Sequence, residues 1–315
     1  LFLLPLFTFI GVEARAASAG YRADCPLYNT TIMESPVKFA KLSGGIEIAY
    51  TEAGEGSKTL LFLHGLGSNK KSWQKNIASL QHHYRCIALD LPGYEESSKS
   101  DYPFSMHFFA EKVAEFIRHL KLEKVILVGH SMGGQVAVTL ALAHPAITEK
   151  LILIAPAGFE TFSETEKAWF KAVYTPEVVK AVPVEQIRKN FEINFFSFPQ
   201  DAEFMIADRM KLREQTEAYA YYCDMIPKNV MAMLNEPVFD RLSGITAPTL
   251  IIFGANDQLI PNPILHKGLT VFDIARKGHF KIRGSKLAFL PNSGHFVQWE
   301  QATAANEIIA GFVEE

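Results

Sequence analysis

The hydrophobic residues of the chain fall into short continuous runs, separated by segments in which apolar positions recur every three to four residues. A continuous apolar run of this length is typical of a strand buried on both faces, and the longer period is typical of an amphipathic helix. Strands and helices that alternate in this way favour a parallel sheet covered by helices on both sides. Buried strands are predicted at residues 59–63, 86–90, 124–128, 151–154, 249–253 and 286–290, and helices at 73–81, 106–120, 135–144 and 298–313.

A hairpin is predicted ahead of these buried runs. Residues 37–42 and 45–51 alternate polar and apolar positions on either side of Ser43-Gly44-Gly45. Alternation with a period of two is typical of strands that have one solvated face. The hairpin and the buried runs together make eight strands.

The alternation of strands and helices stops between residues 159 and 235. This stretch of 77 residues has helical spacing and contains 13 aromatic residues, where the chain average of 12% predicts about nine. It also holds five of the eight methionines. We therefore predict a helical cap at 159–235 with an apolar interior, inserted between two parts of an α/β core at 37–158 and 236–315. The same side chains suit a lid over an apolar pocket.

Length and charge restrict the class of protein. A chain of 315 residues accommodates one large α/β domain with an insertion. The formal net charge is −3, and the Lys and Arg residues are scattered along the chain. This distribution argues against a nucleic-acid partner.

The first 19 residues have a different character. Residues 1–12 are almost purely apolar and are followed by two Ala-x-Ala steps, a pattern that resembles a signal peptide or the remnant of a membrane anchor. Twelve residues are too few to cross a bilayer, which needs about 20. We expect an exported protein, periplasmic or secreted, whose amino terminus is cleaved or kept as an anchor, and which is able to contact a membrane surface. Residues 20–36 read as a polar lead-in, and Cys25 and Cys223 are able to pair in an oxidising compartment.

The most informative motif is the G-x-S-x-G pentapeptide at residues 129–133. An apolar strand precedes it and a helix-forming run follows it. Strand, sharp turn and helix are the context of a nucleophile elbow, in which the backbone of the central serine is strained and its hydroxyl is exposed at the sheet edge. We therefore predict Ser131 as the nucleophile.

A serine hydroxyl needs a base within hydrogen-bond reach and an acid that orients this base. Asp257 follows the strand at 249–253, and the loop after the strand at 151–154 offers no carboxylate before Glu160. Two histidines compete for the base, and both occur in Gly-His-Phe. His295 follows the last strand, whereas His279 lies among charged residues in what reads as an exposed insertion. We predict Asp257 as the acid and His295 as the base.

The oxyanion formed on attack needs donors that are already in place. The backbone N–H of Met132, directly after the nucleophile, is one predicted donor. The glycine-rich loop after the strand at 59–63 supplies the second at Leu66, and His64 is expected to brace this loop. Histidine and cysteine spacings typical of metal sites do not occur, nor do phosphate-binding glycine motifs. We therefore expect no metal and no cofactor.

Five motifs together resemble those of the α/β-hydrolase superfamily. They are the oxyanion loop at residues 64–67, the D-x-P-G turn at 90–94, the elbow at 129–134, the acid loop at 254–257 and the histidine loop at 294–295. The resemblance covers about residues 37–315. It implies the α/β-hydrolase fold, with a mostly parallel eight-stranded sheet flanked by helices and an inserted helical cap. Within the superfamily, the chain is most similar to serine esterases and lipases of the monoacylglycerol-lipase-like type.

Two features depart from this family pattern. Residues 94–97 read Tyr-Glu-Glu-Ser in place of the commoner His-Gly-x-Ser. His295 lies 38 positions after Asp257, a longer gap than we expect for the family. Both departures predict altered loops near the site.

The resemblance implies a serine hydrolase that cleaves carboxylic esters, with apolar acyl esters or monoacylglycerol-like lipids as small-molecule substrates. Trp169, Phe195 and Phe296 are the predicted substrate contacts. Two alternatives remain open. A carbon–carbon bond hydrolase of dienoic keto acids would use the same triad with a cationic grip from Arg188, Arg209 or Arg213, and a non-catalytic ligand-binding protein would use the scaffold alone. The sequence gives no oligomeric state.

Overall fold

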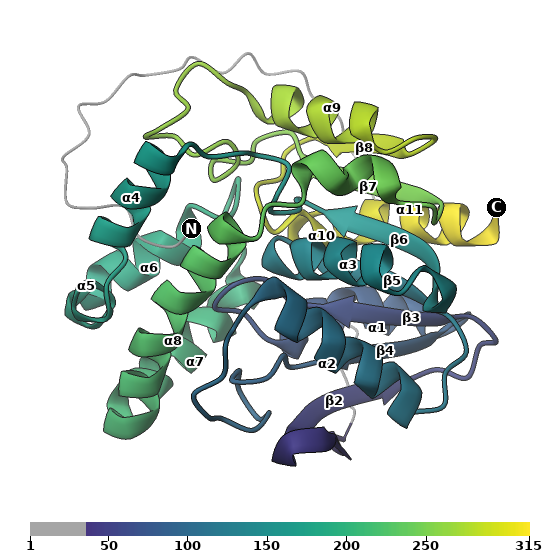
Figure 1. The fold of residues 1–315 in the computed structure, drawn as a ribbon, viewed down its shortest axis with the longest axis horizontal. Coiled ribbons are helices and arrows are strands. Elements are labelled where there is room, and N and C mark those ends of the chain that lie inside the picture. Colours follow the sequence, from purple (N-terminus) through teal and green to yellow (C-terminus); the bar gives the residue numbers. More distant parts are fainter. Residues whose placement is uncertain (1–35) are drawn as a thin grey trace.

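A computed structural model describes residues 36–315, and its centre is a single eight-stranded sheet (Figure 1). The strand order is β1-β2-β4-β3-β5-β6-β7-β8, with β3 to β8 parallel and the first two strands antiparallel to their neighbours. The expected mostly parallel sheet is confirmed. The strands are β1 (Lys38–Lys41), β2 (Glu47–Ala53), β3 (Thr59–Leu63), β4 (Arg85–Leu89), β5 (Val125–His130), β6 (Thr148–Ile154), β7 (Thr249–Gly254) and β8 (Lys286–Leu290). The predicted signal or anchor at 1–19, and Cys25 with its pairing, lie outside the described residues.

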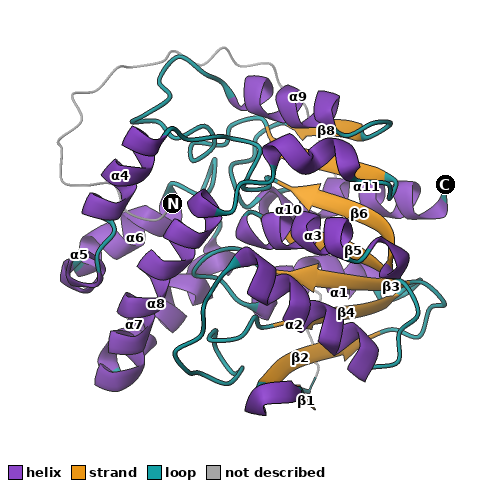
Figure 2. Ribbon diagram, in the orientation of Figure 1, coloured by secondary structure: helices purple, strands orange, loops and turns teal. Residues whose placement is uncertain are grey.

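Helices cover both faces of the sheet (Figure 2). Every residue of β3, β5 and β7 is buried, as continuous apolar runs require. One face packs against α2 (Met106–His119), α3 (Met132–Ala143) and α9 (Val271–Lys281). The other packs against α1 (Gln74–Leu80) and α11 (Ala302–Glu314), next to the short α10 (Val297–Glu300).

The stretch around His279 corrects one sequence-based expectation. It is helix α9 rather than an exposed insertion, and its inner face carries the buried side chains of Val271, Ile274 and Ala275. The helix lies so close to the core that a Cβ added to Gly278 would be 2.1 Å from the ring of Phe159. The dense charges on the outer face of this helix conceal its apolar stripe in the sequence.

Between β6 and β7 the chain leaves the sheet and forms five helices beyond the carboxyl ends of the parallel strands (Figure 2). We call residues 164–235 the cap. A capping box, formed between Ser163 and Glu166, starts its first helix, and Thr175 caps the second. The cap helices are α4 (Glu164–Val173), α5 (Pro176–Ala181), α6 (Val184–Glu192), α7 (Glu203–Glu214) and α8 (Thr216–Asn235).

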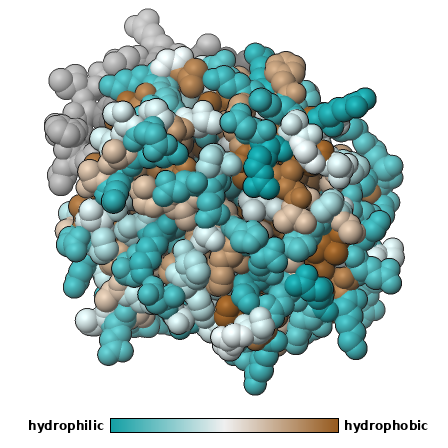
Figure 3. Space-filling view, viewed as in Figure 1, coloured by the Kyte–Doolittle hydropathy of each residue, from teal (hydrophilic) through white to brown (hydrophobic). Residues whose placement is uncertain are grey.

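The surface is mostly hydrophilic on the face seen in Figure 3, with hydrophobic residues in small separate groups. Among the helices of residues 36–315, none has the length and apolar character needed to cross a bilayer.

Candidate active site

Ser131 occupies the turn between β5 and α3 in a strained conformation. Its backbone angles are φ 53° and ψ −118°, a region that costs a residue with a side chain about 1–3 kcal/mol. The turn closes because its flanks lack side chains. A Cβ on Gly129 would lie 2.4 Å from the carbonyl oxygen of Gly133, and a Cβ on Gly133 would lie 2.3 Å from that of Leu63. The geometry is that of a nucleophile elbow.

His295 and Asp257 form a buried pair at the same edge of the sheet. The Nδ1–H of His295 donates to Oδ2 of Asp257 at 2.8 Å, and the two side chains are 3% and 0% exposed. The other carboxylate oxygen accepts the backbone N–H groups of Leu259 and Ile260 at 2.8 and 3.1 Å. The carboxylate is therefore fixed by three donors. It holds the imidazole in the tautomer that leaves Nε2 free to accept a proton.

His130 links the serine to the histidine loop. It precedes Ser131, and its Nε2–H donates to the backbone carbonyl of His295 at 3.0 Å, with the two rings 4.8 Å apart. No hydrogen bond joins Ser131 to His295 within residues 36–315. Catalytic hydrogen bonds are often loose without substrate and tighten in the complex. The elbow and the Asp–His pair thus meet at one place.

The sequence assigned no chemical role to His130, because the second position of the G-x-S-x-G motif accepts any residue. Burial lowers the pKa of its imidazole well below the usual value, and the neighbouring His295 lowers it further. The ring is therefore neutral and acts as a donor that fixes the backbone of His295. Only the folded structure reveals this contact, since the two residues are 165 positions apart.

The two predicted oxyanion donors have no competing partner. The backbone N–H groups of Leu66 and Met132 donate no hydrogen bond to another group in the described part of the chain. The loop that carries Leu66 passes beside Ser131, because a Cβ added to Gly65 would lie 3.1 Å from Cβ of Ser131. Met132 is also the first residue of α3, whose amino end favours negative charge. The arrangement suits an oxyanion hole.

Buried polar contacts hold this oxyanion loop. His64 donates from Nδ1 to the carbonyl of Gly65 at 2.8 Å and accepts the N–H of Leu91 on Nε2 at 3.0 Å. Burial lowers the pKa of His64 to about 4, so the ring stays neutral and keeps both bonds. Farther along the loop, Lys70 donates to Asp90 at 2.7 Å, with both side chains buried. These contacts join the loop to the turn at residues 90–94.

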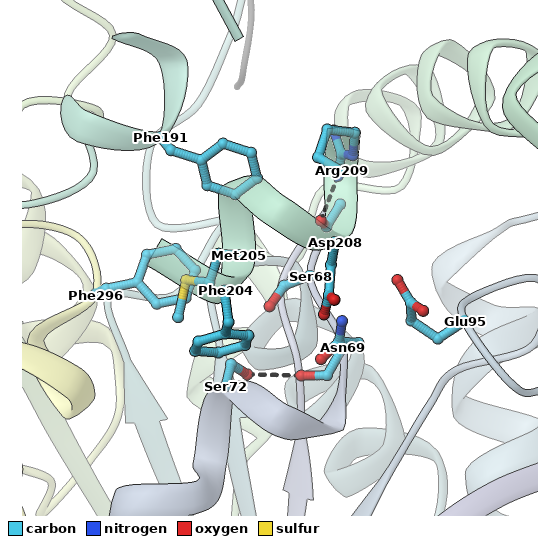
Figure 4. A pocket seen from close by; sticks show the side chains of 11 residues that line it. Ser68, Asn69, Ser72, Glu95, Phe191, Phe204, Met205, Asp208, Arg209 and Phe296 are labelled. Atoms are coloured by element: carbon cyan, nitrogen blue, oxygen red, sulfur yellow. Dashed lines mark hydrogen bonds between the residues drawn. The ribbon is translucent and has the colours of Figure 1, made fainter. Parts of the chain in front are cut away.

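Two small cavities lie at the cap, and Ser131, Asp257 and His295 line neither of them. The first runs between the oxyanion loop and α6 and α7, and Figure 4 shows its side chains, with Phe191 and Arg209 at the cap end and Asn69 and Ser72 at the core end. The second lies inside the cap among α5, α6 and α8, and its wall is mainly apolar. Phe191 and Arg209 line both cavities.

The three predicted substrate contacts lie in different surroundings. Phe296 lines the first cavity. Phe195 stacks against Phe296 with ring centroids 5.3 Å apart, and it lines neither of these two cavities. Trp169 lies on α4, packs edge-on against Phe170 at 5.2 Å, and is likewise outside both. Their contact with substrate stays a prediction.

The rival histidine has other contacts. His279 lies in α9 and forms a hydrogen bond through Nδ1 with the hydroxyl of Ser285 at 2.8 Å.

A second ionisable cluster, which the sequence pattern does not predict, lies beside the acid loop. His266 contacts Glu160 at 2.5 Å and Glu166 at 3.0 Å and ties this loop to the start of the cap. Within residues 36–315, no group of three or more His, Cys, Asp or Glu residues suits a metal ion.

A family model, curated relatives and solved structures resemble this chain. A family model described as alpha/beta hydrolase fold matches residues 58–302. A curated relative from Klebsiella pneumoniae, named 2-hydroxy-6-oxononadienedioate/2-hydroxy-6-oxononatrienedioate hydrolase, is 27% identical over 85% of this chain and 91% of its own.

Solved structures show the same fold. A bacterial membrane phospholipase A, described as a virulence factor, is 26% identical with a TM-score of 0.73, over 89% of this chain and 86% of its own. An esterase from Exiguobacterium antarcticum is 24% identical with a TM-score of 0.70, over 88% and 99%.

Proposed function

The chain belongs to the α/β hydrolase family, and from this premise we propose that it is a serine hydrolase that cleaves carboxylic esters. The observation that carries the proposal is the combination of a strained serine elbow with a buried carboxylate that orients an imidazole at the same sheet edge. This is the arrangement by which a serine hydroxyl is activated for acyl transfer.

In the proposed reaction, Nε2 of His295 takes the hydroxyl proton while Ser131 attacks the ester carbonyl. The backbone N–H groups of Leu66 and Met132 stabilise the oxyanion of the tetrahedral intermediate. His295 then returns the proton to the leaving alcohol, which departs and leaves an acyl-enzyme. A water molecule, deprotonated by the same imidazole, releases the acid and restores Ser131.

We propose that the acyl group is apolar. The cavity inside the cap has a mainly aliphatic and aromatic wall, which suits a hydrocarbon chain. The likeness to a membrane phospholipase A supports a lipid-like ester as substrate. Export of the protein and its contact with a membrane surface stay predictions.

The test is hydrolysis of a series of p-nitrophenyl esters by the wild type, by Ser131→Ala and by Ser57→Ala, which replaces an exposed serine. We expect the loss of turnover in the first variant and wild-type rates in the second. Longer acyl chains should be preferred over acetate. Turnover that survives in a folded Ser131→Ala protein overturns the assignment of the nucleophile.

A carbon–carbon bond hydrolase of dienoic keto acids is the second candidate. It is supported by the relative named 2-hydroxy-6-oxononadienedioate hydrolase. Of the three arginines weighed as a carboxylate grip, Arg209 alone lines the cavities described above, whereas Arg188 pairs with Glu203 and Glu192. Turnover of a dienoic keto acid by a protein inactive on simple esters would replace the first candidate with this one.

A further inference from the structure

Arg209 connects the cap to the oxyanion loop. It lies on α7, and its Nη2–H donates to the backbone carbonyl of Gly67 at 2.7 Å. Gly67 follows the proposed oxyanion donor Leu66 and has a left-handed backbone with φ 66°. The contact joins positions 142 residues apart in the sequence. It places a rigid cationic donor of the cap directly on the loop that stabilises the oxyanion.

The guanidinium group is held in place by aromatic side chains. Its Nη1 donates to the hydroxyl of Tyr222 on α8, and the guanidinium carbon Cζ lies 4.0 Å from the centroid of the Tyr222 ring. The ring of Phe191 on α6 lies 5.5 Å away. Contacts of a guanidinium with aromatic faces add to its hydrogen bonds. Three cap helices therefore fix the orientation of Arg209.

On the core side, the same loop is supported by Tyr94, which stands where the commoner family motif has histidine. The buried hydroxyl of Tyr94 faces the backbone of Gly67 and lies 3.8 Å from Sδ of Met132. Tyr94 also packs edge-on against His64 with centroids 4.8 Å apart. Gly67, which follows the proposed donor Leu66, is thus enclosed between a core phenol and a cap guanidinium.

The cap has separate attachments that do not depend on Arg209. The carboxylate of Glu300 accepts backbone N–H groups of Phe196 and Ser197 in the cap and of Gly294 in the histidine loop, at 2.9, 3.0 and 2.6 Å. The backbone N–H of Phe296 donates to the carbonyl of Asn194 at 3.1 Å. Removal of the Arg209 side chain should therefore loosen the oxyanion loop while the cap remains attached to the core.

We propose that Arg209 is a positioning residue that couples the cap to the oxyanion hole: by holding the carbonyl of Gly67, it sets the alignment of the Leu66 N–H. This inference rests on the proposed function. An aligned donor is worth more to the transition state than to the bound ester. Loss of the contact should therefore lower kcat and leave KM nearly unchanged.

The experiment compares Arg209→Met, Arg209→Lys and Tyr222→Phe with the matched control Arg188→Met. Arg188 lies in the same cap, and the contacts described for its side chain are to the cap residues Glu203 and Glu192. The substrate is p-nitrophenyl butyrate, a neutral ester, so recognition of a substrate carboxylate does not contribute. A second readout is amide hydrogen exchange of a peptide covering residues 64–69, which needs no substrate.

We expect Arg209→Met to lower kcat about 10-fold to 100-fold, less than the about 10²–10³ for a deleted oxyanion donor. Arg209→Lys, which keeps one donor group, should recover part of the loss. Tyr222→Phe should show a smaller decrease, and Arg188→Met none. Exchange at 64–69 should accelerate most in Arg209→Met, less in Arg209→Lys and Tyr222→Phe, and not at all in Arg188→Met.

Wild-type kcat in Arg209→Met, a change confined to KM, or unchanged exchange at residues 64–69 would each overturn the coupling. Absence of ester turnover in the wild type is a different result. It defeats the proposed function, and hydrogen exchange still decides whether Arg209 holds the loop.

Discussion

Replacement of Asp257 by asparagine tests whether this carboxylate orients the imidazole of His295, the proposed catalytic base. The change keeps the size of the side chain, and its carbonyl oxygen is able to retain the two backbone N–H bonds from Leu259 and Ile260. The amide NH₂ then faces Nδ1 of His295 in place of a carboxylate oxygen. Because an amide donates there, the imidazole must carry its proton on Nε2.

The size of the effect follows from this change of tautomer. A histidine protonated on Nε2 offers no lone pair to the hydroxyl of Ser131, so proton abstraction fails in the resting enzyme. The corresponding change in serine proteases lowers kcat about 10⁴-fold, which corresponds to about 5 kcal/mol of activation free energy. The side chains of His295 and Asp257 are 3% and 0% exposed. Water therefore has little access to the pair and cannot replace the lost carboxylate as a hydrogen-bond partner of the imidazole.

The assay is steady-state hydrolysis of a p-nitrophenyl ester by Asp257→Asn, with the thermal unfolding midpoint measured in parallel. Asp240→Asn is the control, since its carboxylate is 95% exposed and 3.8 Å from Lys281. A folded Asp257→Asn protein that retains more than about a tenth of the wild-type kcat would refute the tautomer argument.

Three further predictions concern stability. Lys70→Met leaves the buried carboxylate of Asp90 without its cation and should lower the free energy of unfolding by about 3–5 kcal/mol, measured by urea denaturation; a loss below 1 kcal/mol would contradict this. Gly278→Ala places a Cβ 2.1 Å from the ring of Phe159 and should cost about 1–3 kcal/mol, visible as a lower melting temperature. Burial lowers the pKa of His64 from 6.5 to about 4, so between these pH values the unfolded chain binds a proton that the folded chain does not. The stability due to this neutral ring is complete above pH 6.5 and falls by up to about 3 kcal/mol as the pH drops to 4; a flat profile of unfolding free energy over this range would show the reasoning to be wrong.

The sheet was predictable because its strands are buried on both faces. A continuous apolar run of five residues, such as residues 59–63, is too short for a buried helix and therefore predicts a buried strand. The structure places β3 there. Helix α9 was not predicted because its inner face has only four buried residues, one of them Gly278, and the other positions are largely charged. Burial of a narrow stripe depends on a partner surface that the local sequence does not reveal.

In the candidate site too, local motifs were predictable and contacts between distant residues were not. The elbow, the acid loop and the histidine loop are local motifs, and the hydrogen bond between Asp257 and His295 joins two of them. The contacts of His130 with the carbonyl of His295, and of Arg209 with that of Gly67, were not predictable. Both involve a side chain and a backbone carbonyl far apart in the sequence. Any residue at the accepting position offers the same carbonyl, so neither contact leaves a pattern.

The central claim is that Ser131 is a nucleophile activated by His295 and Asp257. Its most direct test is to treat the protein with a fluorophosphonate and to map the adduct by mass spectrometry of the proteolysed chain. We predict one phosphonyl group on Ser131 in the wild type and none in Ser131→Ala. A folded protein that remains unlabelled, or that carries the adduct on another residue, would contradict it.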